Sequence, residues 1–457
     1  MDIPKGINFI DYQLEMLNTQ LAYAVGHSRF YREKLAGVEL PLKTLADIKR
    51  LPFTTAADIT GHGGEMVCGG AGMARRVVTI NSAGTGGAPK RLFFSETDLK
   101  RTEDFFTAGM RYMCDAGDRV MIFMPADSEN GIGQLLVRGL TELGAIPYAY
   151  GLISDFDEAA AALRQERYHT AIGIPAQIRK LALLAPDIRP ANVLLSADYV
   201  SAAAKETISR LWGCEVFTHY GLTETGYGCA VECRAHDGQH IRHDELLVEI
   251  VEPEWAGSAA AEAAPTAAAT TSAAADMYKP GTGWGEIVIT TLRREAMPLI
   301  RYRTGDLGRL IQGRCACGSE LPRLDQVQGR LQELQYEINI YRMDELLQSR
   351  DEILDYHTVM NASGLFVALE AAAGAETGAV VICRDILSRT WPETPAIVRL
   401  AGDSPVTLVS ASDIRLSTDG DSATVFLPQS DSPPTYKKLH GWTVKRGIER
   451  IGNISVL

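Results

Sequence analysis

The feature that most constrains the fold is a regular alternation of strand-type and helix-type segments between residues 120 and 220. Short apolar runs are each followed by a stretch whose apolar residues recur at helical spacing. This alternation predicts an α/β fold, with a mainly parallel, helix-covered sheet that binds ligands beyond the carboxyl ends of its strands. The expected strands are 120–123, 145–150, 171–174, 193–195 and 216–220, and the expected helices are 131–144, 157–168, 176–184 and 201–213.

The segments that flank this alternation predict two domains. Apolar spacing predicts an N-terminal helix over 9–35, and Ser95 with Asp98 forms a capping box that opens a helix to about Cys114. After residue 220 the pattern changes to strands and turns, typical of a β subdomain. We expect a large domain over 1–329, with a low-complexity surface insertion at 255–278, and a small mobile α+β domain over 330–457.

Charge and hydropathy exclude several classes of protein. Among the 457 residues, 45 Lys and Arg stand against 57 Asp and Glu, so the net charge of −12 disfavours nucleic acids and anionic membranes as partners. No apolar run reaches the ~18 residues of a membrane-spanning helix. The first residues also lack the basic and apolar regions of a signal peptide. We therefore expect a cytoplasmic protein.

A glycine-rich loop, SAGTGGAPK at residues 82–90, lies between two predicted strands. Glycine lets the backbone approach a phosphate closely, while Lys90 supplies a positive charge. The loop differs from that of nucleotide hydrolases, because Pro89 and Arg91 replace the required Gly and Ser or Thr. The loop thus indicates a phosphate site, with a ligand-free hairpin turn as the alternative.

Two further motifs lie where they could reach the same ligand. YGLTE at 220–224 ends a predicted strand, and RYRTGD at 301–306 lies in the β region. Asp306 is suited to bind two ribose hydroxyls, and Glu224 to hold Mg²⁺ on phosphates. The alternatives are a Tyr220 packed in the core and an Asp306 that caps a turn.

In their order and spacing, these three motifs and Gly329-Arg330 resemble the adenylate-forming superfamily of acyl-CoA synthetases, adenylation domains and luciferases. The resemblance is closer to the phenylacetate–CoA ligase branch, on the segments HSRFYREKLAG, LKTLADIKRLPFTTAADI and Glu232-Cys233 to His240. It covers residues 1–330 well and 331–457 poorly.

The resemblance implies an ATP-dependent, AMP-forming ligase that joins an aryl or arylacetic acid to CoA, through an acyl-adenylate and a rotation of the small domain. It also suggests Mg²⁺ and a homodimer. The alternatives are an enzyme that passes the acyl group to an amine or protein thiol, and an ATP-binding accessory protein. The resemblance implies that the β,γ-phosphates of ATP are bound by Ser82, Gly84, Thr85, Gly86, Gly87 and Lys90, and that the adenine is flanked by Ser196, Ala197, Asp198, Tyr220 and Gly221. It further implies that Thr223 contacts the α-phosphate, that Glu224 binds Mg²⁺, and that Asp306 and Arg330 hold the ribose.

The C-terminal segment departs from the pattern of the superfamily. The superfamily places a lysine that aids adenylation in a Gly-Lys pair near the end of the chain. Here the segment YKKLHGWTVKRGIERI offers Lys437, Lys438 and Lys445 but no such pair. We take Lys445 as the candidate catalytic lysine, although Thr443 takes that position if KRGI matches the final strand of the family. A solvated basic tail is the alternative.

The cysteines suggest a metal site. Cys233, His240, Cys315 and Cys317 would form a tetrahedral Cys₃His set for structural Zn²⁺, and similar positions occur in the phenylacetate–CoA ligase branch. His236 is a rival fourth ligand, and Cys229 a weaker one. The alternative is four residues that never meet.

The acyl pocket is less well defined by the sequence. Phe123, Met124, Pro125 and the turn 131–133 are candidate lining residues, with ordinary core packing as the alternative. His219 is either a pocket residue or a hydrogen-bonded core histidine.

Overall fold

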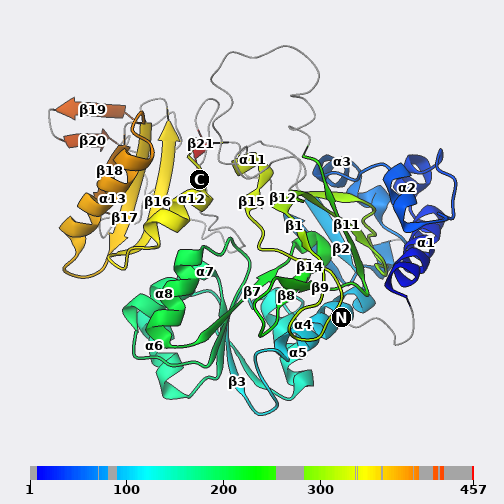
Figure 1. Ribbon diagram of the computed structural model, residues 1–457, viewed down its shortest axis with the longest axis horizontal. Helices are drawn as coiled ribbons and strands as arrows, with labels where there is room; N and C mark the ends of the chain where they lie inside the picture. Colours follow the sequence, from blue (N-terminus) through cyan, green and yellow to red (C-terminus); the bar gives the residue numbers. More distant parts are fainter. Residues whose placement is uncertain are drawn as a thin grey trace. The chain divides into compact units, whose positions relative to one another are not determined.

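The structure is a computed structural model, shown in Figure 1. It describes residues 8–69, 71–80, 90–253, 283–334, 336, 338–361, 364–394, 396–400, 415–419, 422–426 and 455–456. The chain divides into two compact units, 1–345 and 346–457, which we describe separately. The predicted domain boundary at residue 330 stays a prediction. Leu331 and Leu334 pack against Leu307 of the larger unit.

A nine-stranded sheet organises the described part of the larger unit. Its strands follow the order β13-β14-β9-β8-β7-β6-β5-β3-β4, in which β7 to β4 are parallel and the rest antiparallel. The strands are β3 (Arg119–Phe123), β4 (Ile146–Ala149), β5 (Thr170–Gly173), β6 (Asn192–Leu195), β7 (Glu215–Tyr220), β8 (Ala230–Glu232), β9 (Gln239–Ile241), β13 (Leu310–Ile311) and β14 (Arg323–Leu324).

Helices cover both faces of the parallel strands, as Figure 1 shows. Residues that alternate along a strand point to opposite faces, so each strand supplies both layers. Ile122 joins the core under α4 (Glu96–Met110) and α5 (Ile132–Leu143). Its neighbour Phe123 joins the core under α6 (Phe156–Gln165), α7 (Pro175–Leu184) and α8 (Ala202–Trp212). The predicted α/β class is therefore confirmed.

A second, antiparallel sheet has the order β10-β11-β12-β15. Its strands are β10 (Leu246–Val251), β11 (Gly285–Thr291), β12 (Tyr302–Gly308) and β15 (Gly329–Arg330). A separate hairpin pairs β1 (Arg76–Ile80) with β2 (Lys90–Phe94). Short helices elsewhere in the larger unit are η1 (Leu45–Arg50), α3 (Ala56–Met66), η2 (Ala71–Met73), η3 (Thr223–Thr225) and α11 (Leu331–Leu334).

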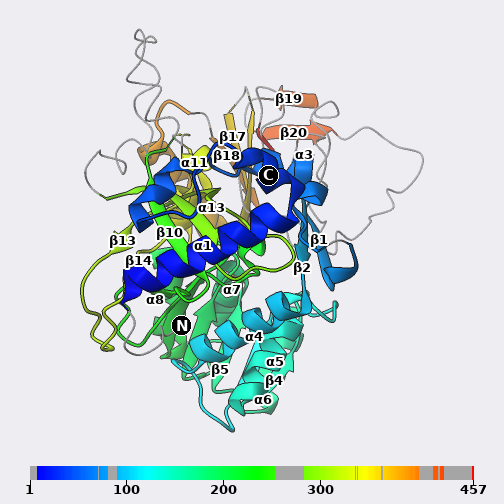
Figure 2. The same cartoon turned by 90° about the vertical axis from the view of Figure 1, so that its right-hand side faces the viewer.

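The predicted N-terminal helix over 9–35 is two helices, α1 (Phe9–His27) and α2 (Arg29–Lys34). The prediction of one helix was wrong because Ser28 takes an extended backbone, and its hydroxyl caps α2 by accepting from the Tyr31 amide. Figure 2 shows α1 along its length, and Gln13 joins it to the start of β10 and the residues just before it by donating to the His243 and Leu246 carbonyls. The predicted capping box of Ser95 and Asp98 is present at the start of α4, which ends at Met110 rather than Cys114.

The smaller unit contains a mixed sheet in the order β18-β17-β16-β21. The described elements are β16 (Ile353–Asn361), β17 (Gly364–Ala371), α13 (Glu376–Thr390), β18 (Ala396–Leu400), β21 (Ser455–Val456) and a hairpin of β19 (Arg415–Asp419) with β20 (Ser422–Phe426). Helix α12 (Ile340–Leu347) spans the division between the units.

Two expectations fall mainly outside the described residues: the insertion at 255–278 and the basic C-terminal segment. In the part of the chain that the structure describes, no helix is both long and apolar enough to cross a membrane.

Candidate active site

A buried ion pair joins two of the predicted motifs. Lys90, the first residue of β2, places its Nζ 2.6 Å from Oε1 of Glu224, which lies in η3 after β7. The Tyr302 hydroxyl donates to the same oxygen at 2.9 Å. Burial alone would raise the pKa of Glu224, but the Lys90 ammonium, with smaller contributions from a backbone hydrogen bond and Arg330, brings the net pKa below its usual value. Glu224 is therefore a buried carboxylate held in its charged form.

A second ion pair lies on the strands that follow. Asp306 of β12 pairs with Arg330 of β15 in the sheet register, and Arg330 Nε lies 2.9 Å from Asp306 Oδ1. The Tyr220 hydroxyl donates to Asp306 Oδ2 at 2.7 Å. Burial and the Asp306 charge raise the pKa of Tyr220, so the phenol keeps its proton and remains a donor.

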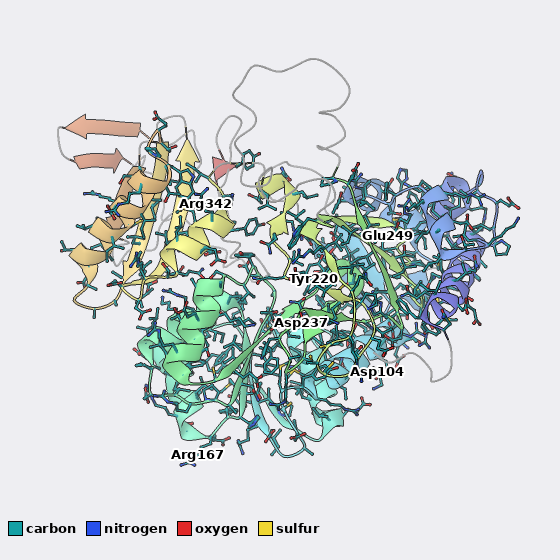
Figure 3. The ribbon with its side chains drawn as sticks, in the orientation of Figure 1. Asp104, Arg167, Tyr220, Asp237, Glu249 and Arg342 are labelled. Carbon is teal, nitrogen blue, oxygen red and sulfur yellow. The ribbon has the colours of Figure 1, made fainter. Side chains whose placement is uncertain are left out.

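The two ion pairs are close enough to influence one another. Arg330 is one of the charges that lower the pKa of Glu224, after the larger effect of Lys90. Both pairs lie beyond the carboxyl end of β7, which ends at Tyr220, labelled in Figure 3. This is the edge of a parallel sheet at which ligands bind. The structure thus brings Lys90, Tyr220, Glu224, Asp306 and Arg330 to one site.

Two glycines permit close packing of the chain at this site. A Cβ on Gly221 would lie 1.9 Å from the Tyr227 carbonyl oxygen, so only glycine fits at the turn after β7. Gly329 has a φ of +127°, and a Cβ there would lie 2.3 Å from the Tyr341 ring. The Arg330 amide next to it donates to the Tyr341 hydroxyl at 2.9 Å.

The other predicted adenine residues follow β6. The Ser196 hydroxyl lies 2.8 Å from Nδ1 of His219, rather than facing open solvent. Ala197 has a φ of +72°, the left-handed region that a non-glycine residue seldom adopts. Asp198 accepts from the Tyr199 amide at 2.8 Å. Thr223 opens η3, directly before Glu224.

Several predicted site residues lie outside the described residues, so their roles stay predictions. They are the loop residues Ser82, Gly84, Thr85, Gly86 and Gly87, and the candidate catalytic residue Lys445.

Sequence reasoning missed Tyr302, although it stands in the RYRTGD motif four residues before Asp306. Burial and Glu224 raise the pKa of Tyr302, which keeps its hydroxyl a donor toward that carboxylate. Its position in the motif was the signal that could have found it.

An apolar cavity adjoins β7. Of the residues predicted to line an acyl pocket, Met124 and Ile132 line this cavity. Phe123 instead packs in the core under α6, α7 and α8. The other lining residues are Phe105, Phe106, Gly109, Met110, Leu136, Ile172, Leu194, Ser196, His219 and Val231.

The four residues predicted as metal ligands lie together, with their ligand atoms all within 4.8 Å of one another. Cys233 follows β8 and His240 lies in β9, while Cys315 and Cys317 lie between β13 and β14. The sulfurs of Cys233 and Cys315 are 3.7 Å apart, and Cys317 Sγ is 3.4 Å from His240 Nε2. The rival His236 instead contacts Glu215, with Nε2 2.9 Å from Oε1, and is not one of this group.

The comparisons with known proteins agree with this geometry. The chain is 27% identical over 371 residues to a phenylacetate–CoA ligase of Thermus thermophilus, covering 76% of this chain and 77% of the relative. It is 26% identical over 361 residues to a phenylacetate–CoA ligase of Escherichia coli, with coverage of 70% and 71%. The chain resembles the phenylacetate–CoA ligases. The predicted resemblance to this branch of the adenylate-forming superfamily is therefore confirmed.

Solved structures extend the resemblance of this ligase-like chain to the fold. A 2-hydroxyisobutyryl-CoA ligase in the postadenylation state, in complex with 2-HIB-AMP, superposes with a TM-score of 0.68. It is 18% identical and covers 89% of this chain and 91% of its own. No protein-family model matches the chain.

Proposed function

We propose that the protein is an ATP-dependent, AMP-forming ligase that joins an aryl or arylacetic acid to CoA. The observation that carries this proposal is the convergence of the Lys90–Glu224 and Asp306–Arg330 ion pairs beyond the carboxyl end of the parallel sheet. The relatives named phenylacetate–CoA ligase support both the acid class and the acceptor.

The two ion pairs offer complementary chemistry for a nucleotide with its metal. Lys90 would bind phosphate oxygens as a point charge, which releases Glu224 to hold Mg²⁺. Asp306 uses one oxygen for Arg330 and the other for Tyr220. A carboxylate oxygen can accept more than one hydrogen bond, so Asp306 is of the right chemical type to bind ribose hydroxyls. These residues therefore fit ATP with Mg²⁺.

The reaction would proceed in two displacements at this site. A carboxylate oxygen of the acid attacks the α-phosphorus. The bond between the α-phosphorus and the bridging oxygen breaks, and pyrophosphate leaves with that oxygen. The thiol of CoA then loses its proton and attacks the acyl carbon, and AMP leaves with the oxygen that joined it to the acid. Positioning and the charges of Lys90 and Glu224 would supply most of the catalysis.

We also propose that Cys233, His240, Cys315 and Cys317 hold a structural Zn²⁺. Two sulfurs bound at ~2.3 Å to a tetrahedral ion lie about 3.8 Å apart, and a sulfur and a nitrogen slightly less. The observed 3.7 Å and 3.4 Å fit those spacings. A metal there would join the β8–β9 hairpin to the β13–β14 connection, with four protein ligands and no open position for chemistry.

Acid-dependent exchange of labelled pyrophosphate into ATP tests the proposed activation step across aromatic, aliphatic and heterocyclic acids. We expect exchange with aryl or arylacetic acids, followed by consumption of CoA. Exchange without CoA consumption would favour an amine or protein thiol as the acceptor. Absence of exchange with every acid would contradict both enzymes and leave an accessory ATP-binding protein.

A further inference from the structure

The cavity beside β7 is apolar except at one place. Its lining is made of aromatic, aliphatic, methionine and glycine residues, with Ser196 and His219 as its polar side chains. The His219 ring lies against Phe105 and Phe106, with ring centroids 5.8 Å and 6.5 Å apart. The ring of an aromatic acid would match this lining, which leaves the polar edge of His219 to be explained.

The two ring nitrogens of His219 differ in their partners. Nδ1 lies 2.8 Å from the Ser196 hydroxyl. Nε2 is buried and has no hydrogen-bond partner among the described residues. A buried polar atom without a partner costs free energy, so such an atom in a ligand cavity points to a partner on the ligand.

The contact with Ser196 determines which kind of partner Nε2 needs. The Oγ of Ser196 has this single hydrogen bond among the described contacts. We assign the hydroxyl as the donor to Nδ1, because its proton then has a partner within the protein, and this makes Nδ1 the acceptor. The neutral ring then carries its proton on Nε2, as a donor. Burial lowers the pKa of His219 to about 4, so the ring is neutral near pH 7 and suits a neutral partner better than a second carboxylate.

We infer that His219 is a specificity-determining residue whose Nε2–H donates to a neutral acceptor atom on the ring portion of the acid. The substrate class is an aromatic acid with a hydroxyl, ether or carbonyl substituent, or with a ring nitrogen, in addition to its reacting carboxylate. This inference rests on the proposed function, because it assigns the cavity to the acid of that reaction. It goes further by predicting that unsubstituted and methylated aryl acids are poor substrates.

The test compares pairs of acids of similar shape in pyrophosphate exchange with the full chain. Hydroxyphenylacetates are paired with methylphenylacetates, and pyridylacetates with phenylacetate, each with the substituent or nitrogen at the ortho, meta and para positions. We expect at least one polar member to be favoured about tenfold or more in kcat/KM, as the gain of one hydrogen bond to a buried donor requires. Ratios within about twofold for every pair would overturn the inference.

Two variants distinguish the loss of the His219 donor from a general change in the shape of the cavity. His219→Leu removes the donor and is expected to bring the ratio of the favoured pair to one or below. Met110→Leu alters the apolar lining alone and is expected to keep that ratio. A ratio that survives in the His219→Leu variant would overturn the inference. The comparison within wild-type protein decides the matter even if His219→Leu fails to fold.

The inference and the proposed function can fail separately. Exchange with equal rates for both members of every pair would leave the ligase intact and remove the role of His219. If no acid supports exchange, the same pairs are compared by calorimetric binding. Tighter binding of a polar member that is lost in the His219→Leu variant would then support the inference, whereas equal or absent binding would overturn it.

Discussion

Lys90 and Glu224 lie 134 residues apart in the chain, yet their Nζ and Oε1 atoms are 2.6 Å apart in the structure. The pair brings the residue that ends the glycine-rich motif to the acidic residue of YGLTE. A buried carboxylate whose partner is a cation suits a site that exchanges this partner for a metal and a phosphate.

Glu224→Gln is expected to lower acid-dependent pyrophosphate exchange by about 10²–10³-fold, because it removes a charge that would hold Mg²⁺ in the transition state. The matched control is Glu249→Gln, which breaks the buried pair of Arg301 and Glu249 on β10. Figure 3 labels Glu249 away from Tyr220. We expect the control to keep exchange within a few-fold. Equal losses in both variants would mean that stability alone is being measured.

Lys90→Met is expected to destabilise the fold by about 2 kcal/mol near pH 7, since it leaves the Glu224 carboxylate buried without its cation. The Lys90 charge lowers the pKa of Glu224, so the pair stabilises the wild type above the usual glutamate range and less as pH falls below it. The cost of Lys90→Met should therefore shrink toward pH 4. Urea unfolding of both proteins at a series of pH values measures this cost, and a constant cost would contradict the account.

His219 should make the fold sensitive to acid. Burial lowers its pKa to about 4, below the usual 6.5, so the unfolded chain binds the proton more readily between these values. The folded state therefore has its full stability above about pH 6.5, where His219 is neutral in both states, and it loses stability as pH falls toward 4. We expect His219→Leu to gain roughly 3 kcal/mol relative to wild type over this range. Met110→Leu, in the same cavity, should show no such gain.

The metal cluster predicts a zinc content near one per chain in purified protein, and a lower melting temperature after chelation. Cys317→Ser should lose the metal, because it removes one of four ligands. Cys68→Ala is the matched control, since Cys68 is a buried free cysteine outside the cluster. A zinc content near zero in wild type, or equal zinc in Cys317→Ser and wild type, would contradict the assignment.

The sheet and the motifs could be predicted because each carries a local signal. The buried strands β3, β5 and β6 are apolar runs between helices, and their period is visible in the sequence. The break at Ser28 was missed because a serine within helical spacing can cap a new helix or simply continue the old one.

The polar contacts inside the site were harder to predict, because they depend on which side chains meet across the fold. Ser196 directly follows β6 and His219 is the penultimate residue of the neighbouring strand β7, and no spacing rule predicts that their side chains pair. The sequence left two interpretations of His219 open, a pocket residue and a hydrogen-bonded core histidine. Both apply, since Nδ1 is hydrogen-bonded and the ring also lines the cavity.

The central claim, formation of an acyl-adenylate that CoA then cleaves, is tested most directly by tracing oxygen. The full chain is incubated with ATP, Mg²⁺, CoA and an aryl or arylacetic acid labelled with ¹⁸O in both carboxylate oxygens. The masses of the products are then measured by mass spectrometry. We predict one ¹⁸O atom in each AMP, because the carboxylate oxygen that attacks the α-phosphorus leaves with it, and one in each thioester. Unlabelled AMP, or label in orthophosphate beside ADP, would contradict the account.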